Sequence, residues 1–383
     1  MRLTDDSLQK MAQSNYEGEI YFGNAEESGE ILSKKYPFAH ILLLLSIKTA
    51  DKFSFFQKLF PNAVIIVLLP SDGAERLFAV SDDIALTVCY GEDYVVCASR
   101  YFSSVRNLPC AVFAFDARSA ALSAAMVQIT VGGERGEYPT KRAELLFADT
   151  TLLNNDFLFE AYIQTASVAV GLFELKFDGL ILASDYKLAH FSAAKEAAAS
   201  CLQTPFAVTD RRKIFCAALS LAMLNEKGFP CGEVKILSET YRQLGAGAMS
   251  GFYAMDKLAK IYHVFFTCGT YRKYYTPPYH VRVRQAAALY KKREEEISAA
   301  QILPDTPTLA SYSDVLESVR PQFLKDAEDL LKKTEWLGQT LEEKKTAYPM
   351  ENKVLNAALK YLPEGNKNYG ITSLMRDFGL FDF

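Results

Sequence analysis

The sequence has no marked excess of either charge and no long hydrophobic run. With 42 basic and 46 acidic residues, the formal net charge is −4, which argues against nucleic-acid binding as the main role. The longest apolar run near the N-terminus, HILLLLSI, is too short to cross a membrane. Residues 1–18 lack the apolar core of a signal peptide. These absences predict a cytoplasmic protein that has neither nucleic acid nor a membrane as its partner.

Paired cysteines and catalytic triads are also missing. The seven cysteines include no C-x-x-C pair, and most lie in apolar runs, so buried reduced thiols are predicted in place of a disulfide framework. No Ser-His-Asp or Cys-His arrangement is evident, and no internal repeat or low-complexity tract occurs. Half of the residues are hydrophobic and 23% are charged, which is ordinary for a globular protein with a large core.

What the first part of the chain does contain is a series of apolar strand patterns. The length of 383 residues favours two domains. Apolar runs predict strands over 39–47, 63–69, 83–91 and 109–116, with helical segments between them. An earlier strand ends at Gly23, and a hairpin and a last strand near 144–148 follow. Continuous apolar strands that alternate with helices indicate a parallel sheet covered on both faces.

Beyond Asp149 the strand signal almost disappears. Residues 156–225 are rich in Ala, Leu and Phe at helical spacing, and long helical patterns continue over 229–350. The predicted fold class is therefore an α/β N-terminal domain with a Rossmann-like parallel sheet, residues 1–152. It is followed by an all-helical C-terminal domain, residues 153–383.

Several short stretches resemble one superfamily, the dehydroquinate-synthase-like and iron-containing alcohol dehydrogenase group. IYFGNAEESGEIL resembles its opening strand and helix, YVVCASRYFSSVRNLP its nucleotide helix, and LLFADTTLL its interdomain strand. SDYKLAHF and NYGITSLMRDFGLFD resemble stretches of the sn-glycerol-1-phosphate dehydrogenase branch. The resemblance covers nearly the whole chain, and it depends on the order and spacing of these pieces.

The resemblance implies a specific chemistry. Members of the superfamily bind NAD(P) at a Gly-Gly-Gly turn and hold one divalent metal (zinc, nickel or iron) between the domains, through an Asp and two His. The metal polarises the oxygen of an alcohol while hydride passes to or from the nicotinamide. A single remaining ligand does not hold such an ion. NAD(P) and the metal are thus implied for this chain by resemblance only.

The cofactor positions have changed. Counting back from Pro109, the glycine triplet falls on Gly91, Glu92 and Asp93. Two carboxylates repel a diphosphate, and they can cap the helix N-terminus that would otherwise bind it. The remaining cofactor positions read Cys97, Arg100, Ala114 and Phe115. We expect a capped helix that binds no dinucleotide.

The metal positions have changed as well. The first ligand falls on Glu174 when the alignment is made on Gly171, or on Leu175 when it is made on Asp185. The second falls on Ala254, preceded by Tyr253, and alanine binds no metal. Counting back from Tyr290, the third falls on Tyr275.

Histidine is scarce, with four in the chain, and none has a clear ligand pattern. His280 lies five residues beyond Tyr275 and, with Glu174, is the remaining metal candidate. A loop histidine of this kind is more often a surface or capping residue. His40, His190 and His263 are read as a strand edge, a helix end and a core or interface position.

The segment TYRKYYTPPYHVRVR combines aromatic and basic side chains. Such groups can stack on and grip an anion. Lys273, Tyr275, His280 and Arg282, together with Arg100, are therefore candidates for binding a small anionic metabolite in the cleft between the domains. The alternative is a solvated helix connection whose tyrosines cover apolar surface. A second copy of the chain is the other partner left open.

Two functions remain open from the sequence. In the first, the chain is a degenerate glycerol-1-phosphate dehydrogenase-like protein that has lost metal-dependent dehydrogenase activity and binds a small anion. In the second, it is an active NAD(P)-dependent polyol or polyol-phosphate oxidoreductase with a rebuilt site. The missing glycine triplet and the two missing histidines favour the first.

Overall fold

The computed structural model describes residues 16–116, 119–148, 153, 155–182, 191–226, 232–268, 279–301 and 303–380. The chain divides into two compact units. Unit 1 comprises Met1–Ala161 and Asp210–Gly228, and unit 2 comprises Tyr162–Thr209 and Phe229–Phe383. The sequence predicts the boundary between the α/β domain and the helical domain at 152/153. The division in the structure differs in two ways: unit 1 extends to Ala161, and it also includes the helix Arg211–Glu226.

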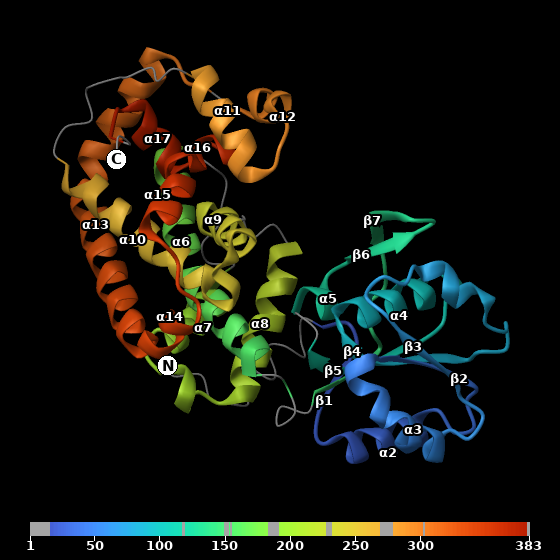
Figure 1. Ribbon diagram of the computed structural model, residues 1–383. Coiled ribbons are helices and arrows are strands. Elements are labelled where there is room, and N and C mark those ends of the chain that lie inside the picture. Colours follow the sequence, from blue (N-terminus) through green and yellow to red (C-terminus); the bar gives the residue numbers. More distant parts are fainter. Residues whose placement is uncertain are drawn as a thin grey trace. The chain divides into compact units, whose positions relative to one another are not determined.

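Unit 1 is built on a parallel six-stranded sheet with the order β1-β8-β5-β4-β2-β3 (Figure 1). Its strands are β1 (Glu19–Phe22), β2 (Ile41–Ser46), β3 (Val64–Leu68), β4 (Leu86–Glu92), β5 (Cys110–Asp116) and β8 (Leu145–Ala148). A separate antiparallel hairpin is formed by β6 (Met126–Val131) and β7 (Glu134–Pro139).

Helices cover both faces of this sheet. The helical segments of unit 1 include α2 (Ala25–Lys35), η1 (Ile47–Lys52), α3 (Phe53–Leu59), η2 (Ala74–Ala79), α4 (Asp93–Arg106), α5 (Ser119–Ser123) and α8 (Arg211–Glu226), which packs on α5. In Figure 1, α2 and α3 lie on one face of the sheet and α4 on the other. All six residues of β2 are buried, because a strand inside a doubly covered parallel sheet must be apolar on both faces.

The two faces differ in chemistry. On the α2–α3 face, Phe56 and Leu32 pack with alternate strand residues such as Phe113 and Phe147, whose ring centroids lie 4.7 Å apart. On the α4 face, polar groups join the packing. There the Thr87 hydroxyl bonds to Ser103, and Ser99 bonds to Cys110 at 3.4 Å.

The sequence also marks where helix α2 begins, since Asn24 and Glu27 form a capping box at its start.

Unit 2 is helical throughout the part that the structure describes. Its segments are α6 (Asn155–Ile181, the first seven residues of which belong to unit 1), α7 (Ser192–Cys201), η4 (Phe206–Val208), α9 (Glu233–Tyr241), η5 (Arg242–Ala246), η6 (Gly247–Met249), α10 (Ser250–Thr267), α11 (Tyr279–Tyr290), α12 (Glu294–Ala300), α13 (Thr306–Thr340), α14 (Glu342–Ala347), α15 (Asn352–Lys360), α16 (Leu362–Gly365) and α17 (Ile371–Asp377).

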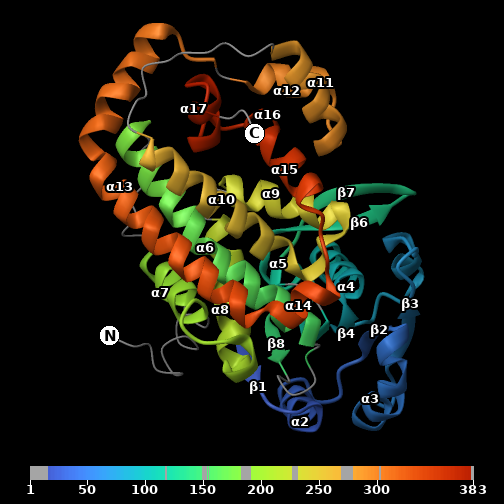
Figure 2. The ribbon, with the colours of Figure 1, turned by 60° about the vertical axis from the view of Figure 1, so that its left-hand side comes forward.

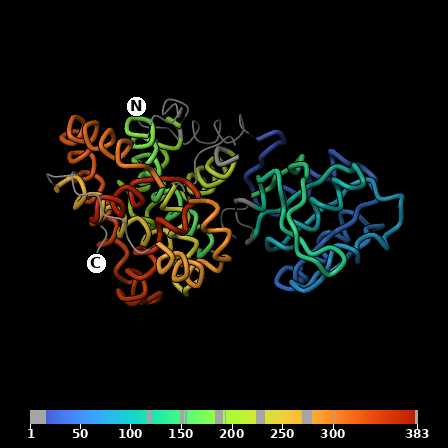
Figure 3. Tube along the Cα trace, turned by 90° about the horizontal axis from the view of Figure 1, so that it is seen from above, coloured from blue at the N-terminus to red at the C-terminus, as the bar shows by residue number. Residues whose placement is uncertain are grey.

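Three long helices form the centre of unit 2. Figure 2 shows α13 running alongside α6 and α10. Their contact is aromatic, since Phe173 of α6 stacks on Tyr262 of α10 and meets Phe323 of α13 edge to face. Figure 3 shows green, yellow, orange and red parts of the trace intermingled within this unit. Segments that are far apart in the sequence therefore share one core.

The structure confirms the predicted fold class and the positions of its strands. One strand differs in its surroundings. The run AVIIVLL is as apolar as a central strand, yet β3 lies at the edge of the sheet and Val67 is 37% exposed. The cysteine prediction is confirmed for the described residues, where six free cysteines occur and five of them are buried.

Among the described residues, α6 alone is long and apolar enough, by length and composition, to suit a membrane span. However, 67% of its most apolar stretch is buried inside the protein, as in the core helix of a globular protein.

The aromatic core of unit 1 yields a stability prediction. Phe113 is buried and contacts Phe56, Tyr90 and Phe147. Replacing it with alanine leaves a cavity, so Phe113→Ala should lower the free energy of unfolding by about 3 to 5 kcal/mol in urea denaturation. The matched control is Phe38→Ala, because Phe38 is fully exposed in the same unit, and it should change stability by no more than about 0.5 kcal/mol. Equal effects of the two substitutions would contradict this core assignment.

Candidate functional site

The first candidate site is the loop between β4 and α4. Gly91 is the last but one residue of β4, and it lies against the N-terminal end of η1. A Cβ atom at Gly91 would lie 3.0 Å from the Cβ of Ser46 and 3.2 Å from its backbone nitrogen. The glycine therefore serves the close approach of two strand ends, whether or not a phosphate binds there.

Glu92 is the N-cap residue of α4, but its side chain makes no capping hydrogen bond. The prediction that it caps the helix is therefore wrong. Its carboxylate instead pairs with Lys48 of η1 at 2.6 Å and accepts a longer bond from Tyr94 at 3.4 Å. The nearby lysine provides a stronger partner than the helix amides, and the acid stays at the carboxyl end of the sheet. Asp93 follows as the first residue of α4.

Arg100 is placed away from any ligand surface of unit 1. Its side chain is fully buried, and it donates to the carbonyl oxygens of Lys141, Ala121 and Ala124. Burial lowers the pKa of this guanidinium, and the three carbonyls offset the cost of burying it. Arg100 thus fixes the segment from α5 to β8 onto α4. Of the three other predicted cofactor positions in unit 1, Cys97 and Ala114 are buried and Phe115 is partly buried.

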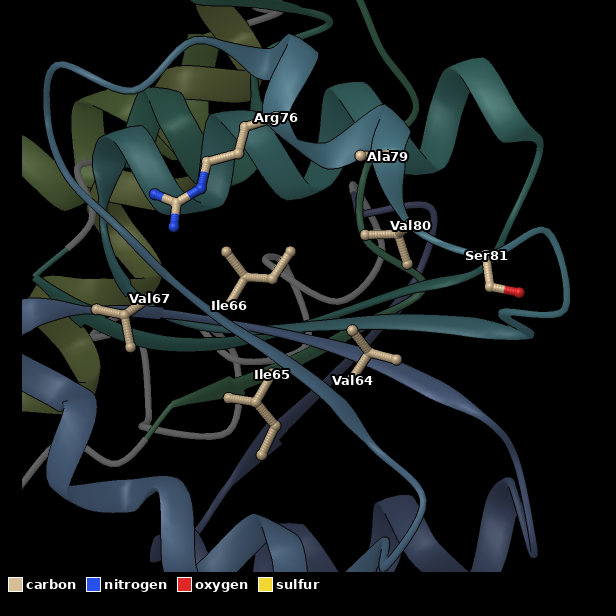
Figure 4. A pocket seen from close by; sticks show the side chains of 8 residues that line it. All are labelled: Val64, Ile65, Ile66, Val67, Arg76, Ala79, Val80 and Ser81. Carbon is tan, nitrogen blue, oxygen red and sulfur yellow. The ribbon is translucent and has the colours of Figure 1, made fainter.

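A pocket of about 510 Å³ lies beside the edge strand β3 (Figure 4). The side chains that line it are those of Val64, Ile65, Ile66, Val67, Arg76, Ala79, Val80 and Ser81. Its cation, Arg76, is already paired with Asp72 at 2.6 Å. The pocket contains none of the residues that the sequence predicts for a site.

The second candidate site lies in unit 2, around Glu174 of α6. Its carboxyl group is 4% exposed, and Oε1 lies 2.9 Å from the Tyr262 hydroxyl and 3.2 Å from the Val234 amide. The Tyr262 hydroxyl also lies 2.6 Å from Oε2 of Glu233, which is 2% exposed. Glu233 Oε1 in turn accepts from the amide and hydroxyl of Thr372, at 2.9 and 2.6 Å. We call Glu174, Glu233, Tyr262 and Thr372 the acidic network.

The acidic network connects helix ends. Glu174 accepts from an amide in the first turn of α9, and Glu233 does the same in the first turn of α17. Both helices begin with a glycine N-cap, Gly232 and Gly370, which has no side chain of its own to cap with. Each acid therefore supplies from another helix the acceptor that an N-terminus requires.

Burial raises the pKa of the acids in this region. It raises the pKa of Glu174 well above its usual value, and the charge of Glu233 raises it further. Burial raises the pKa of Glu233 as well, while the bonds from Thr372 and Tyr262 oppose this effect. Asp178, one turn beyond Glu174 on α6, has its pKa raised to about 7 by burial and then by the charge of Glu233. Protonated carboxyl groups are favoured here.

The residues present do not fit the metal site that the fold implies. Glu174 Oε1 is taken by the Tyr262 hydroxyl and the Val234 amide. Oε2 lies directly against Gly232, where a Cβ atom would be 1.6 Å away. Ala254, at a ligand position, is fully buried and offers only carbon, and Tyr253 donates to the Tyr348 carbonyl. In the described ranges, no group of three or more His, Cys, Asp or Glu side chains could hold a metal ion.

His280, the other metal candidate, lies on an exposed position at the start of α11. The structure does not place it with Glu174. His263 is half-buried on α10, and His40 pairs with Asp83 at 2.9 Å. Tyr275, Lys273 and His190 lie outside the described residues.

Arg282, predicted to face an anion, instead belongs to a buried ion network. Its guanidinium makes two bonds to Glu364, at 2.7 and 3.0 Å, and one to the Lys360 carbonyl. Arg376 also contacts Glu364, at 3.1 Å, and pairs with Asp377 at 2.7 Å. Two cations and two anions thus balance within unit 2. The guanidinium of Arg282 is used to hold α11 against α16.

The sequence patterns do not predict Glu233, Tyr262 or the Glu364–Arg376 pair. A usable signal does exist in GLFELKFDG, where Glu174 and Asp178 stand four residues apart in a mainly apolar helix. This spacing places both acids on one helix face. Acids on the apolar face of a core helix must have a partner. The partners of Glu174 lie far along the chain, 88 residues away in the case of Tyr262, and no local pattern identifies them.

The acidic region predicts a pH dependence of stability. A carboxyl group whose pKa is higher in the folded state than in the unfolded state binds protons more tightly when folded. Its contribution is complete below the unfolded value, 3.8 for Asp178, and is lost as the pH rises through the folded value of about 7. The free energy of unfolding should fall by about 1.4 kcal/mol per pH unit for each such proton.

Urea denaturation between about pH 5 and pH 8 measures this slope. Asp178→Asn should make it shallower. The control Asp314→Asn, at an exposed position on α13, should leave it unchanged. The same slope in Asp178→Asn as in the parent would refute the assignment.

The buried ion network yields a second stability prediction. Arg282→Ala leaves Glu364 buried with one cation fewer, so we expect a loss of about 3 to 5 kcal/mol in the free energy of unfolding. Arg284 lies on the same helix but is exposed, and Arg284→Ala should cost less than about 1 kcal/mol. If both substitutions cost the same, the Glu364 contact contributes nothing.

Several solved structures have a fold similar to that of this chain. The chain is similar to a 1,3-propanediol oxidoreductase, with a TM-score of 0.54, 11% identity, and 96% of this chain and 97% of that chain covered. It is similar to an iron-containing alcohol dehydrogenase from Thermococcus thioreducens (TM-score 0.52, 12% identity, 91% of each chain). It is also similar to a maleylacetate reductase from Rhizobium sp. strain MTP-10005 (TM-score 0.51, 13% identity, 94% of each chain). No family model and no curated protein matches the sequence. The chain has the fold of the iron-containing alcohol dehydrogenases, as its motifs predicted.

Proposed function

We propose that this protein is a degenerate glycerol-1-phosphate dehydrogenase-like protein that no longer performs metal-dependent dehydrogenation. The observation that carries the proposal is the state of Glu174. At the position predicted for the first metal ligand, the carboxyl group is closed into hydrogen bonds with Tyr262 and the Val234 amide. These bonds occupy Oε1, while Oε2 is buried directly against the backbone of Gly232, so neither oxygen is open to a cation.

Two further positions support the same proposal. Ala254 replaces a histidine with a methyl group, so one ligand is lost outright. A zinc site with three protein ligands loses its ion when ligands are removed. At the nucleotide position, Glu92 keeps its carboxylate beside the start of α4, where a pyrophosphate would bring like charge.

The role that the proposal leaves to the chain is ligand binding. The ligand class is a small anion, as the aromatic and basic segment 270–284 suggests. Two of the predicted anion-binding groups are engaged internally, Arg100 by backbone carbonyls and Arg282 by Glu364. The hypothesis therefore depends on His280, Lys273 and Tyr275. Lys273→Ala should weaken the binding of inorganic phosphate, and added salt should weaken it further.

Metal content is the first test. Elemental analysis of protein purified without chelator should find no stoichiometric zinc, nickel or iron, because the ligand positions carry Ala254, Tyr275 and a hydrogen-bonded Glu174. About one tightly bound transition metal per chain would defeat the proposal. It would favour an active NAD(P)-dependent polyol or polyol-phosphate oxidoreductase with a rebuilt site.

Nucleotide binding is the second test. NAD(H) and NADP(H) should bind weakly or not at all in calorimetry, with a dissociation constant far above micromolar, a level that corresponds to about 8 kcal/mol. Glu92→Gly combined with Asp93→Gly removes both carboxylates and should strengthen binding if charge is the obstacle. Micromolar binding by the unmodified chain would show that the loop still functions.

A further inference from the structure

The hydrogen bonds of the acidic network allow its protons to be counted. Glu174 Oε1, the Tyr262 hydroxyl oxygen and Glu233 Oε2 form a chain of three oxygen atoms, with separations of 2.9 and 2.6 Å. Each separation requires one proton between the two oxygens. Tyr262 carries one hydroxyl proton and can donate it only once. The second proton must therefore belong to one of the two carboxyl groups.

The surrounding donors identify which carboxyl group carries that proton. Glu233 Oε1 accepts two short bonds from Thr372, at 2.9 and 2.6 Å, and these donors stabilise a carboxylate. Glu174 accepts one longer bond, at 3.2 Å from the Val234 amide, and its Oε2 has no hydrogen-bond partner although it is buried. A buried oxygen without a donor costs far less as a carbonyl than as part of a carboxylate.

We propose that Glu174 is an uncharged carboxylic acid that donates its proton to the Tyr262 oxygen, while Tyr262 donates its own proton to the Glu233 carboxylate. The Glu174 carboxyl group, where the fold implies a metal ligand, thus carries a proton in place of a bond to a cation. This inference rests on the proposed function and extends it to named atoms.

The backbone supports the assignment. A Cβ atom at Gly232 would lie 1.6 Å from Glu174 Oε2, and one at Gly370 would lie 2.6 Å from Glu233 Oε1. Both acids thus occupy space that any other residue at these two helix starts would fill. Close backbone against Oε2 leaves no room for a cation at this oxygen.

Infrared difference spectroscopy tests the assignment directly. At about pH 8, exposed carboxyl groups are ionised, so the carbonyl stretch of a protonated acid marks a buried neutral group. The spectrum of the parent minus that of Glu174→Gln should contain one such band. The control Glu343→Gln, at an exposed position of α14 in the same unit, should give none. Absence of the band in the Glu174→Gln difference would overturn the proposal.

Melting temperatures and two further variants, Glu174→Ala and Tyr262→Phe, extend the test. The amide of Glu174→Gln has the shape of a neutral acid and can donate to Tyr262, so the melting temperature of this variant should match or exceed that of the parent. Glu174→Ala should melt well below both, and an equal loss in the two would contradict the proposal. Tyr262→Phe keeps the acid and removes its acceptor, so the same band must shift in frequency; an unshifted band would count against the bridge.

Failure of the proton assignment can be distinguished from failure of the proposed function. If elemental analysis finds no metal and the acid band is absent, the proposed function stands and the proton assignment fails. If a metal is bound and the acid band is absent, both fail.

Discussion

The burial of two glutamic acids beside one tyrosine is the constraint on which the helical unit depends. Glu174 and Glu233 bring acceptors to the uncapped starts of α9 and α17, and Tyr262 joins the two acids across α10. Four helices thus meet at one polar point in an aromatic core. Such a point is stable only if its charges are neutralised. A family that binds a metal can use the cation for this purpose, whereas here protons and helix amides suffice.

In the α/β unit, residues at the predicted cofactor positions also make structural contacts. Gly91 still permits the close approach of the η1 and α4 starts, because the sheet requires it. The acid that follows is held by Lys48. Arg100, at a predicted cofactor position, bonds to three carbonyls of its own unit. Each of these groups has a structural task that explains its presence without a ligand.

The sequence predicts much of the fold, because strands such as ILLLLS and capping signals such as Asn24 and Glu27 are local. It does not predict that the apolar run of β3 lies at a sheet edge, since strand order depends on distant pairing. The site is less predictable for the same reason. The spacing from Gly171 identifies Glu174, but its partners Val234 and Tyr262 lie 60 and 88 residues further along the chain. Likewise, the basic segment predicts a ligand for Arg282, and no local pattern identifies Glu364, its buried partner 82 residues further on.

The claim that a proton replaces the metal at Glu174 is tested most directly by anomalous scattering. Crystals grown with excess zinc would be measured at the zinc absorption edge, where a bound ion gives a peak that no protein atom can produce. We expect no peak within bonding distance of the Glu174 carboxyl oxygens and an intact contact to Tyr262. A peak bonded to Glu174, with Tyr262 displaced from it, would refute the replacement of the metal by a proton.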